Sequence, residues 1–317
     1  MTHQVTTMAF VGETPWHQIG TRLPARQPIE VWADCAGMAW QIEQAPVRYD
    51  AADNLCTFNQ HKVLYRSDNH DALSVVGSNY KVVQPMEVLE FYRDLTERAG
   101  FELETAGILK GGRKFWALAR TGRSVTLKGV DVVDSYLLLA TSCDGTLATT
   151  ATPTSVRVVC NNTLGAALRG SDGHIKVPHR TSFDPAAMKL QLGLATLQWD
   201  AFMIRMRAMA DRRVNGPEAN RFFEQLLWPA GQSNEGARRA PNDRALKRML
   251  ALFDGQGIGS ELAAAKGTAW GLLNAVTQFV DYERRSLNPE YRLDSAWFGA
   301  GAALKQRALD QAVILAS

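Results

Sequence analysis

The spacing of apolar residues changes near residue 180, and this change constrains the fold more than any other feature of the chain. Before it, short apolar runs such as residues 63–65 and 73–76 are bounded by Asp, Asn and Gly, as β-strands usually are. After it, apolar residues recur every three to four positions, which is the period of an amphipathic helix. We therefore expect an α+β protein with antiparallel hairpins and packed helices in the N-terminal half and a mostly helical C-terminal half. The predicted domains are residues 1–182 and 183–317, the second with a flexible loop near residues 229–242.

Turn and capping residues locate several elements. Pro85 and Asp184-Pro185 are typical helix starts, and Gly100 suits the end of the first of these helices. One hairpin is predicted over residues 101–120 with its turn at Lys110-Gly111-Gly112, and a second over residues 135–152 with its turn at Asp144-Gly145. A short strand is expected at residues 175–177, and further helices are expected at about residues 217–228, 243–252, 260–285 and 296–316.

The segment 155–169 is predicted to be a helix because its apolar residues fall on one helical face. The opposite face carries Arg157, Asn161 and Arg169, with Gly165 between them. Two guanidinium groups and an amide in a row are suited to following a phosphate backbone. A plain solvated helix face is the alternative interpretation.

The first hairpin interleaves cations with aromatic residues, a pattern typical of proteins that bind single-stranded nucleic acid. Lys114, Trp116 and Arg120 share one face of the second strand by period-2 alternation. Leu118 lies on that same face, so a buried tryptophan among solvated charges is the alternative. The candidate nucleic-acid-binding residues are Lys110, Arg113, Lys114, Trp116, Arg120, Arg157, Asn161, Arg169, Lys176 and Arg180.

Charge is distributed unevenly along the chain, which has a net charge of +3 over its 317 residues. Residues 1–100 hold 8 Lys and Arg against 12 Asp and Glu, whereas residues 101–180 hold 10 against 6. Residues 203–250 hold 10 against 5, including a basic run at residues 238–248. An acidic start therefore masks two basic blocks, and the central block contains the candidate residues.

The motifs of the common enzyme classes are missing from the sequence. Gly255, Gly257 and Gly259 follow a predicted helix rather than a strand, so they do not form a dinucleotide-binding loop. The six histidines lack metal-ligand spacing, and Asp131 and Asp134 are expected to be surface carboxylates. We therefore expect a protein without catalytic residues, metal or cofactor.

Cysteine spacing and the distribution of apolar residues indicate the cellular compartment. Cysteine is expected as the reduced thiol because Cys35, Cys56, Cys143 and Cys160 are far apart. We see no secretion signal and no apolar run long enough for a membrane span, so we expect a cytoplasmic protein with no membrane partner.

Four short strings resemble one protein family. They are Thr14-Pro15-Trp16-His17 with Gly20, Tyr80-Lys81-Val82-Val83-Gln84, Arg157-Val158-Val159-Cys160-Asn161-Asn162-Thr163-Leu164, and Gly267-Thr268-Ala269-Trp270-Gly271 with Asn274-Ala275-Val276-Thr277. In this order they are similar to the phage/plasmid-like protein family, a domain of unknown function carried by phages, prophages and plasmids. The resemblance implies a mobile-element protein in a bacterial host cell.

The predicted order of elements is also similar to the core of single-strand annealing proteins, which are oligomers that act in DNA recombination. That similarity implies a basic groove between the hairpin and the helix at residues 155–169, a single-stranded DNA partner and a homo-oligomer. It is one of fold alone and does not establish function.

Two functions are compatible with these observations. The first is a mobile-element-encoded protein that binds or anneals single-stranded DNA, or another nucleic acid, without catalysis. The alternative is a phage or plasmid protein-interaction factor that inhibits or regulates a host protein. An enzyme with scattered carboxylates, such as a nuclease, is a third interpretation.

Overall fold

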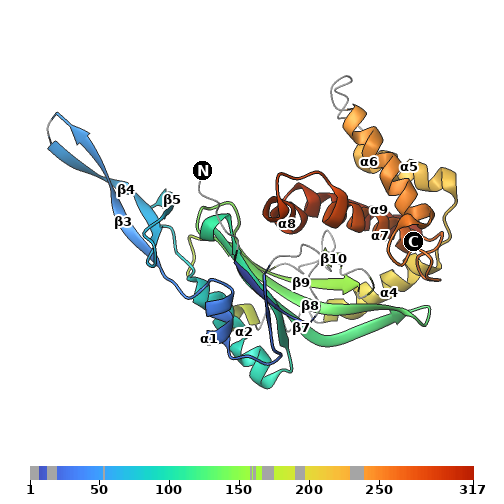
Figure 1. Ribbon diagram of the computed structural model, residues 1–317, viewed down its shortest axis with the longest axis horizontal. Coiled ribbons are helices and arrows are strands. Elements are labelled where there is room, and N and C mark those ends of the chain that lie inside the picture. The colour runs from blue at the N-terminus through green and yellow to red at the C-terminus, as the bar shows by residue number, and fades with distance from the viewer. Residues whose placement is uncertain are drawn as a thin grey trace. The chain divides into compact units, whose positions relative to one another are not determined.

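The computed structural model describes residues 7–12, 20–52, 54–157, 159, 162–165, 175–189, 197–228 and 239–317 (Figure 1). Antiparallel sheets occupy the N-terminal half and helices the C-terminal half, so the α+β prediction is confirmed. The chain forms two compact units. Unit 1 comprises Met1–Gly122, Tyr136–Thr152 and His174–Gly193, and unit 2 comprises Arg123–Ser135, Pro153–Gly173 and Leu194–Ser317.

The larger sheet has the strand order β10-β9-β8-β7-β6-β1-β2, with β11 paired to β9. Its strands are β1 (Met8–Val11), β2 (Thr21–Leu23), β6 (Glu102–Leu109), β7 (Lys114–Leu127), β8 (Asp131–Ser142), β9 (Thr149–Arg157), β10 (Asn162–Gly165) and β11 (Ile175–Val177). The strands β1 and β2 are parallel, whereas β6 is antiparallel to both β1 and β7. Because β7, β8 and β9 are long, each contributes residues to both units.

Both predicted hairpins are present. The turn between β6 and β7 is the short 3-10 segment η1 (Lys110–Gly112), where Gly112 has φ +98° and a Cβ would lie 2.7 Å from the Trp40 ring. Glycine is therefore required there by both conformation and space. In the second hairpin the Asp144 carboxylate accepts a hydrogen bond from the Thr146 backbone N–H at 3.0 Å, which fixes the turn.

The predicted helix at residues 155–169 is wrong. The strand β9 continues to Arg157, and β10 pairs with it antiparallel, with Asn162 opposite Arg157 and Gly165 opposite Thr154. The segment Thr149–Arg157 contains four threonines and one valine, whose branched side chains favour strands once neighbouring strands are available. Arg157 is thus a strand residue, while Asn161 and Arg169 lie outside the described residues.

The helix α2 (Pro85–Arg98) begins at the predicted proline, and Gln84 and Glu87 form a capping box around its start. Tyr92 of this helix is fully buried, and its hydroxyl lies 3.0 Å from the Ala117 carbonyl of β7 and 2.9 Å from the Leu137 carbonyl of β8. This contact anchors α2 on the larger sheet. With α1 (Ile29–Cys35), α2 packs into the hydrophobic core of unit 1.

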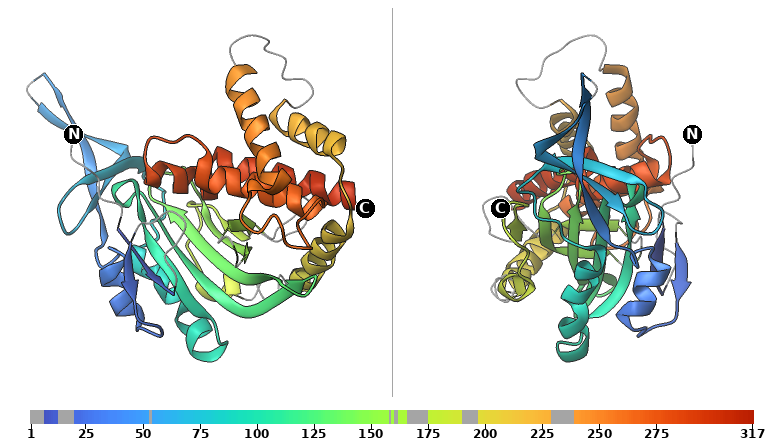
Figure 2. Two further views of the ribbon diagram at one scale, coloured as in Figure 1. Left: turned by 45° about the vertical axis from the view of Figure 1, so that its right-hand side comes forward. Right: turned by 90° about the vertical axis from the view of Figure 1, so that its left-hand side faces the viewer.

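A second, three-stranded sheet in unit 1 has the order β3-β4-β5. Its strands are β3 (Ile42–Ala51), β4 (Asn54–Arg66) and β5 (Ala72–Gly77). Pairing with β5 ends at His61 opposite Gly77, and beyond that point β3 and β4 continue as a two-stranded ribbon (Figures 1 and 2). We call this ribbon, residues 47–52 and 54–58, the arm.

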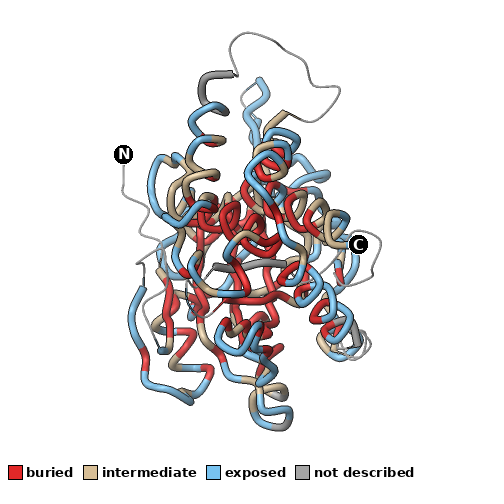
Figure 3. Tube along the Cα trace, turned by 90° about the vertical axis from the view of Figure 1, so that its right-hand side faces the viewer, coloured by how far each residue is buried: buried red, intermediate tan, exposed pale blue. Residues whose placement is uncertain are grey.

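Unit 2 is built mainly from helices. They are α4 (Leu197–Asp211), α5 (Gly216–Leu227), α6 (Arg239–Ala251), α7 (Ala269–Gln278), α8 (Pro289–Phe298) and α9 (Ala300–Ala316), with π-helical turns η2 (Leu252–Gln256) and η3 (Phe279–Glu283). Every residue of α7 is buried, the polar Asn274, Thr277 and Gln278 included. Figure 3 shows how buried and exposed residues are distributed along the chain trace. Within the described part of the chain, no helix has the length and apolar character needed to cross a membrane.

Several helix boundaries differ from the sequence prediction. The helix expected from residue 260 begins only at Ala269, because the Thr268 hydroxyl caps it by accepting from the Gly271 N–H at 3.1 Å. Gly299 separates α8 from α9, so the helix expected at residues 296–316 is two helices. Of the predicted loop near residues 229–242, residues 229–238 lie outside the described residues, and residues 239–242 already belong to α6. Asp184 does cap a helix start, since its carboxylate accepts from the Ala186 and Ala187 N–H groups.

Candidate functional site

Some residues of the predicted hairpin surface are buried in the structure. On β7, Lys114 is 6% exposed, Trp116 is 1% exposed and Leu118 is 3% exposed. The face that these residues share therefore points into the protein, in line with the alternative in which the tryptophan is buried. The Trp116 ring offers no open face on which a base could stack.

Arg120 remains at the surface but has an acidic partner. Its Nη2 lies 2.9 Å from Glu104 Oε2 and 3.1 Å from the Tyr136 hydroxyl. Tyr136 in turn donates to Glu104 at 2.7 Å. The Arg120 charge is thus locally balanced, which reduces its attraction for a phosphate group.

Arg113, Lys176 and Arg180 are exposed, and Lys110 is half-buried at the turn of the first hairpin. The Arg113 carbonyl accepts from the Cys143 N–H at 2.8 Å, so the end of the first hairpin adjoins the turn of the second. Lys176 lies on β11, three residues before His179. These positions converge on one region of unit 1.

The centre of this region is a pair of stacked rings, which the sequence did not reveal. Tyr80 and His179 stack with their centroids 4.4 Å apart. The Tyr80 hydroxyl donates to the Ser142 carbonyl at 2.8 Å, and His179 Nε2 lies 2.9 Å from the Leu147 carbonyl. Both rings are thereby fixed on the turn between β8 and β9.

Two further cations join the stacked rings. Lys62 Nζ donates to the Tyr80 carbonyl at 2.8 Å, and the Lys81 N–H donates to the His179 carbonyl at 2.6 Å. We call Lys62, Lys81, Arg113, Lys176 and Arg180 the basic cluster. Local sequence patterns cannot identify such a set, because its members come from four separate segments of the chain.

The charges of this region include the Asp144 carboxylate as well as the cations of the basic cluster. Burial, and to a smaller extent the Lys81 ammonium, lower the pKa of Lys62, whose amino group donates to the carbonyl of Tyr80, the residue before Lys81. Burial acts to raise the pKa of Asp144, but hydrogen bonds from Thr146 and Ser142, with a smaller contribution from the Lys114 charge, hold it below its usual value. Burial and the Asp144 charge raise the pKa of the Cys143 thiol to about 12, so this thiol is not a thiolate nucleophile at neutral pH.

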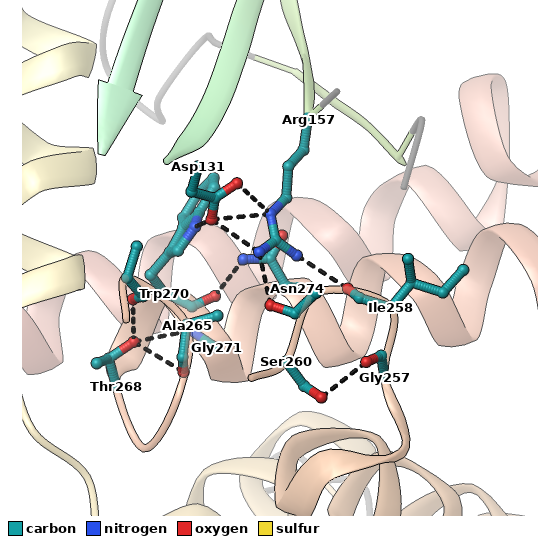
Figure 4. Close-up of polar contacts among 12 residues, drawn as sticks. Asp131, Arg157, Gly257, Ile258, Ser260, Ala265, Thr268, Trp270, Gly271 and Asn274 are labelled. Carbon is teal, nitrogen blue, oxygen red and sulfur yellow. Dashed lines mark hydrogen bonds and ion pairs between the residues drawn. The ribbon is translucent and has the colours of Figure 1, made fainter. Parts of the chain in front are cut away.

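Unit 2 contains a buried ion pair between Arg157 and Asp131 (Figure 4). Arg157 Nε donates to Asp131 Oδ1 at 2.8 Å and Nη2 donates to Oδ2 at 2.7 Å, a two-pronged geometry. The guanidinium is 2% exposed and the carboxylate 0%. The expectations of a solvent-facing Arg157 and a surface Asp131 are therefore wrong.

The remaining hydrogen-bonding groups of this pair are also satisfied. Arg157 donates to the Ile258 carbonyl at 3.1 Å and to the Gly259 carbonyl at 2.9 Å, and Trp270 Nε1 donates to Asp131 Oδ2 at 3.0 Å (Figure 4). A recess beside Arg157 has room for about one water molecule. It is lined by Val133, Ser155, Arg157, Trp270, Leu273, Asn274 and Thr277. The network thus holds strands, loop and helix together.

The basic run at residues 238–248 is only partly described. Arg238 and the Arg239 side chain lie outside the described residues, while Arg244 and Lys247 are exposed on α6. Arg248 forms an ion pair with Glu283, with Nη2 2.8 Å from Oε1. Among the described residues, no group of three or more His, Cys, Asp or Glu could hold a metal ion.

In three of the four strings that suggested a family, described residues take part in the contacts given above. Gln84 caps α2 and accepts from the Ile42 N–H at 2.8 Å, while Tyr80 and Lys81 belong to the ring stack and the basic cluster. Arg157 and Trp270 bind Asp131. The first string, apart from Gly20, lies outside the described residues.

Comparison with curated proteins found no match to this chain, and comparison with solved structures found none either. A family model does match, over residues 72–297, which is more than half of the chain and includes most of the basic cluster and the Arg157–Asp131 pair. The chain therefore belongs to the family described as "Domain of unknown function (DUF932)".

Proposed function

We propose that the protein binds single-stranded nucleic acid, with DNA as the first candidate, through the basic cluster of unit 1. The observation that carries this proposal is the convergence of exposed cations from several segments around the half-buried Tyr80 and His179 rings. Lysine and arginine bind phosphate groups with little regard to sequence, and partly open rings accept bases by stacking.

This proposal differs from the hairpin-and-helix groove expected from the sequence. Trp116 and Arg157 are buried and Arg120 is balanced by Glu104, so none of the three is included. Lys62 and Lys81 take their place beside Arg113, Lys176 and Arg180. The loss of the predicted helix at residues 155–169 therefore moves the binding surface toward β11 and the turn after β8.

Further parts of the proposal come from the sequence resemblance. The protein is encoded by a phage, prophage or plasmid and acts in the cytoplasm of the bacterial host. There it binds or anneals single strands as a homo-oligomer, without a catalytic step or cofactor.

Fluorescence anisotropy with a labelled oligo-dT at about 50 mM salt tests the proposal, because phosphate contacts are strongest at low ionic strength. The test variant combines Lys81→Glu, Arg113→Glu and Arg180→Glu, three exposed members of the basic cluster. We expect at least a tenfold loss of affinity, and a slope of log affinity against log salt that falls by about 2, or roughly 0.7 for each phosphate contact.

The control variant combines Arg205→Glu, Arg207→Glu and Arg221→Glu on the exposed faces of α4 and α5. It changes the net charge by the same amount in unit 2. An equal loss of affinity in both variants would show a general charge effect and contradict the assignment to the basic cluster. Absence of binding by the unaltered protein would overturn the function itself.

The alternative, a factor that binds a host protein, has one observation in its favour. The arm exposes large apolar side chains, with Leu55 62% and Tyr49 52% exposed. A host protein that is retained on this chain after nuclease treatment, together with no binding of oligo-dT, would favour this alternative.

A further inference from the structure

The outer edge of β3 in the arm is an unpaired strand edge. In the sheet order β3-β4-β5, β3 is the edge strand, and within the described residues no strand pairs with its outer side. Residues Val47, Arg48, Tyr49, Asp50 and Ala51 all lie beyond the point where β5 ends. Such an edge has outward N–H and C=O groups that can form a ladder with another strand.

The arm has two distinct faces, because residues that pair across an antiparallel ribbon point to the same side. Val47 pairs with Phe58 and Tyr49 pairs with Cys56, which makes one face apolar. Arg48 and Asp50 lie on the other face, both exposed, together with Leu55, which pairs with Asp50. The edge strand thus presents an alternating pattern of apolar and charged residues.

This pattern is self-complementary in one register. When two identical antiparallel strands are related by a two-fold axis perpendicular to the sheet, one residue must lie opposite its own copy on the axis. With Tyr49 at that position, Arg48 of each strand lies opposite Asp50 of the other, so two opposite-charge pairs form. With Arg48 or Asp50 at the axis, like charges face each other directly, which is unfavourable.

The backbone also limits the pairing to this short stretch. Pro46, which precedes it, has no N–H to donate. Ala52, which follows it, has φ +45° and so leaves the extended conformation. A register shifted toward either end therefore gains no additional backbone hydrogen bonds to offset its unfavourable like-charge contacts.

We propose that the outer edge of β3 pairs with the same edge of a second copy of this chain, centred on Tyr49, to form a four-stranded antiparallel sheet from two arms. The self-complementary charges of Arg48 and Asp50 identify the second copy as the occupant. This inference does not depend on nucleic-acid binding, because the residues of the arm and of the basic cluster are different.

Light scattering coupled to size-exclusion chromatography of the full chain over a range of concentrations tests this dimer. Arg48→Asp and Asp50→Arg each place like charges opposite one another, and we expect either change to raise the dimer dissociation constant about tenfold or more. Combining Arg48→Asp with Asp50→Arg restores opposite charges in the same register, so the double variant returns to the dimer of the unaltered protein.

The control is Arg22→Asp, a charge reversal at an exposed position on β2, which leaves the dimer unchanged. A monomeric unaltered protein at its highest soluble concentration would overturn the proposal. So would single variants that dimerise normally, or a double variant that stays monomeric.

A cross-link gives an independent measurement of the register. Directly opposed residues in an antiparallel pair have Cα atoms about 4.5–5.5 Å apart, within the range for a disulfide. Tyr49→Cys should therefore form a disulfide-linked dimer on oxidation, in a Cys56→Ser background that removes the thiol facing it in the arm. Linkage that is equally efficient after Arg48→Asp is added would contradict the register.

Discussion

Arginines in the two units lie in opposite surroundings. In unit 2, Arg157 is 2% exposed and is held by Asp131 and by two backbone carbonyls. In unit 1, Arg113 and Arg180 are exposed to solvent at the edge of the basic cluster. A buried charge must be fully paired in the folded protein, whereas an exposed one remains available to a ligand.

The difference between the two regions is one of desolvation. Taking a guanidinium and a carboxylate out of water is costly, and this cost is offset only when the ion pair and its remaining hydrogen bonds are all made. The Lys305–Asp281 pair, with its atoms 2.9 Å apart and both side chains buried, is a second example in unit 2. Arg113 and Arg180 keep their hydration at the surface and do not carry this cost, so they remain available to a ligand.

The largest expected effect is the loss of Arg157. Arg157→Ala leaves the Asp131 carboxylate buried without its guanidinium partner, so the free energy of unfolding should fall by about 3–5 kcal/mol. Urea denaturation followed by circular dichroism measures this change. Combining Arg157→Met with Asp131→Leu removes both charges and should recover part of the stability, and an unchanged midpoint for Arg157→Ala would show that the pair does not support the fold.

An intermediate effect is expected at alkaline pH. The folded protein holds the pKa of Cys143 at about 12, while the thiol of the unfolded chain ionises near pH 8.5. The unfolded state therefore releases this proton first, so the stability from the buried thiol is complete below about pH 8.5 and declines between about pH 8.5 and 12. The decline approaches about 1.4 kcal/mol per pH unit for one such group.

Denaturation midpoints measured from pH 7 to pH 11 test this expectation. Burial also raises the pKa of Tyr92 and Tyr136, so the decline steepens once unfolded tyrosines ionise near pH 10. Cys143→Ala should remove the early part of the decline and leave the tyrosine part. An identical pH profile in this variant would exclude Cys143 as its cause.

The smallest effect on stability is expected in the basic cluster. Arg180→Gln removes a hydrated charge, so the denaturation midpoint should stay at that of the unaltered protein. The same change should lower the salt slope of oligo-dT binding by about 0.7, the contribution of one phosphate contact to a single strand. A clear loss of stability in Arg180→Gln would mean that this side chain supports the fold, and the contrast with Arg157 would no longer hold.

The elements that were predicted correctly depend on nearby residues. Pro85 and Asp184 mark helix starts because caps satisfy N–H groups within one turn. Likewise, Gly112 and Asp144 mark hairpin turns because the turn conformation depends on those residues themselves. The strand residues after position 154 were assigned to a helix because the apolar residues of the segment 155–169 fit a helical face, while β9 in fact lies between β8 and β10 in the sheet.

The candidate site was predictable only in part. Arg113, Lys176 and Arg180 were identified from local basic patterns and are exposed. Lys62, Tyr80 and His179 could not be grouped with them, because their contacts join positions that are far apart in the chain. Burial of Trp116 depends on what covers its face of the sheet, which period-2 alternation does not specify.

Short-range periodicity, turn residues and caps were enough to predict the α+β class, the hairpin turns and the helix starts near Pro85, Asp184 and Pro217. Only the tertiary structure decided which charges are buried and which are exposed. Ile258, for example, lies 101 positions after Arg157 and yet accepts its hydrogen bond. The role of a charge depends on access to water and on its partners, and both are set by chain segments that are brought together only in the folded protein.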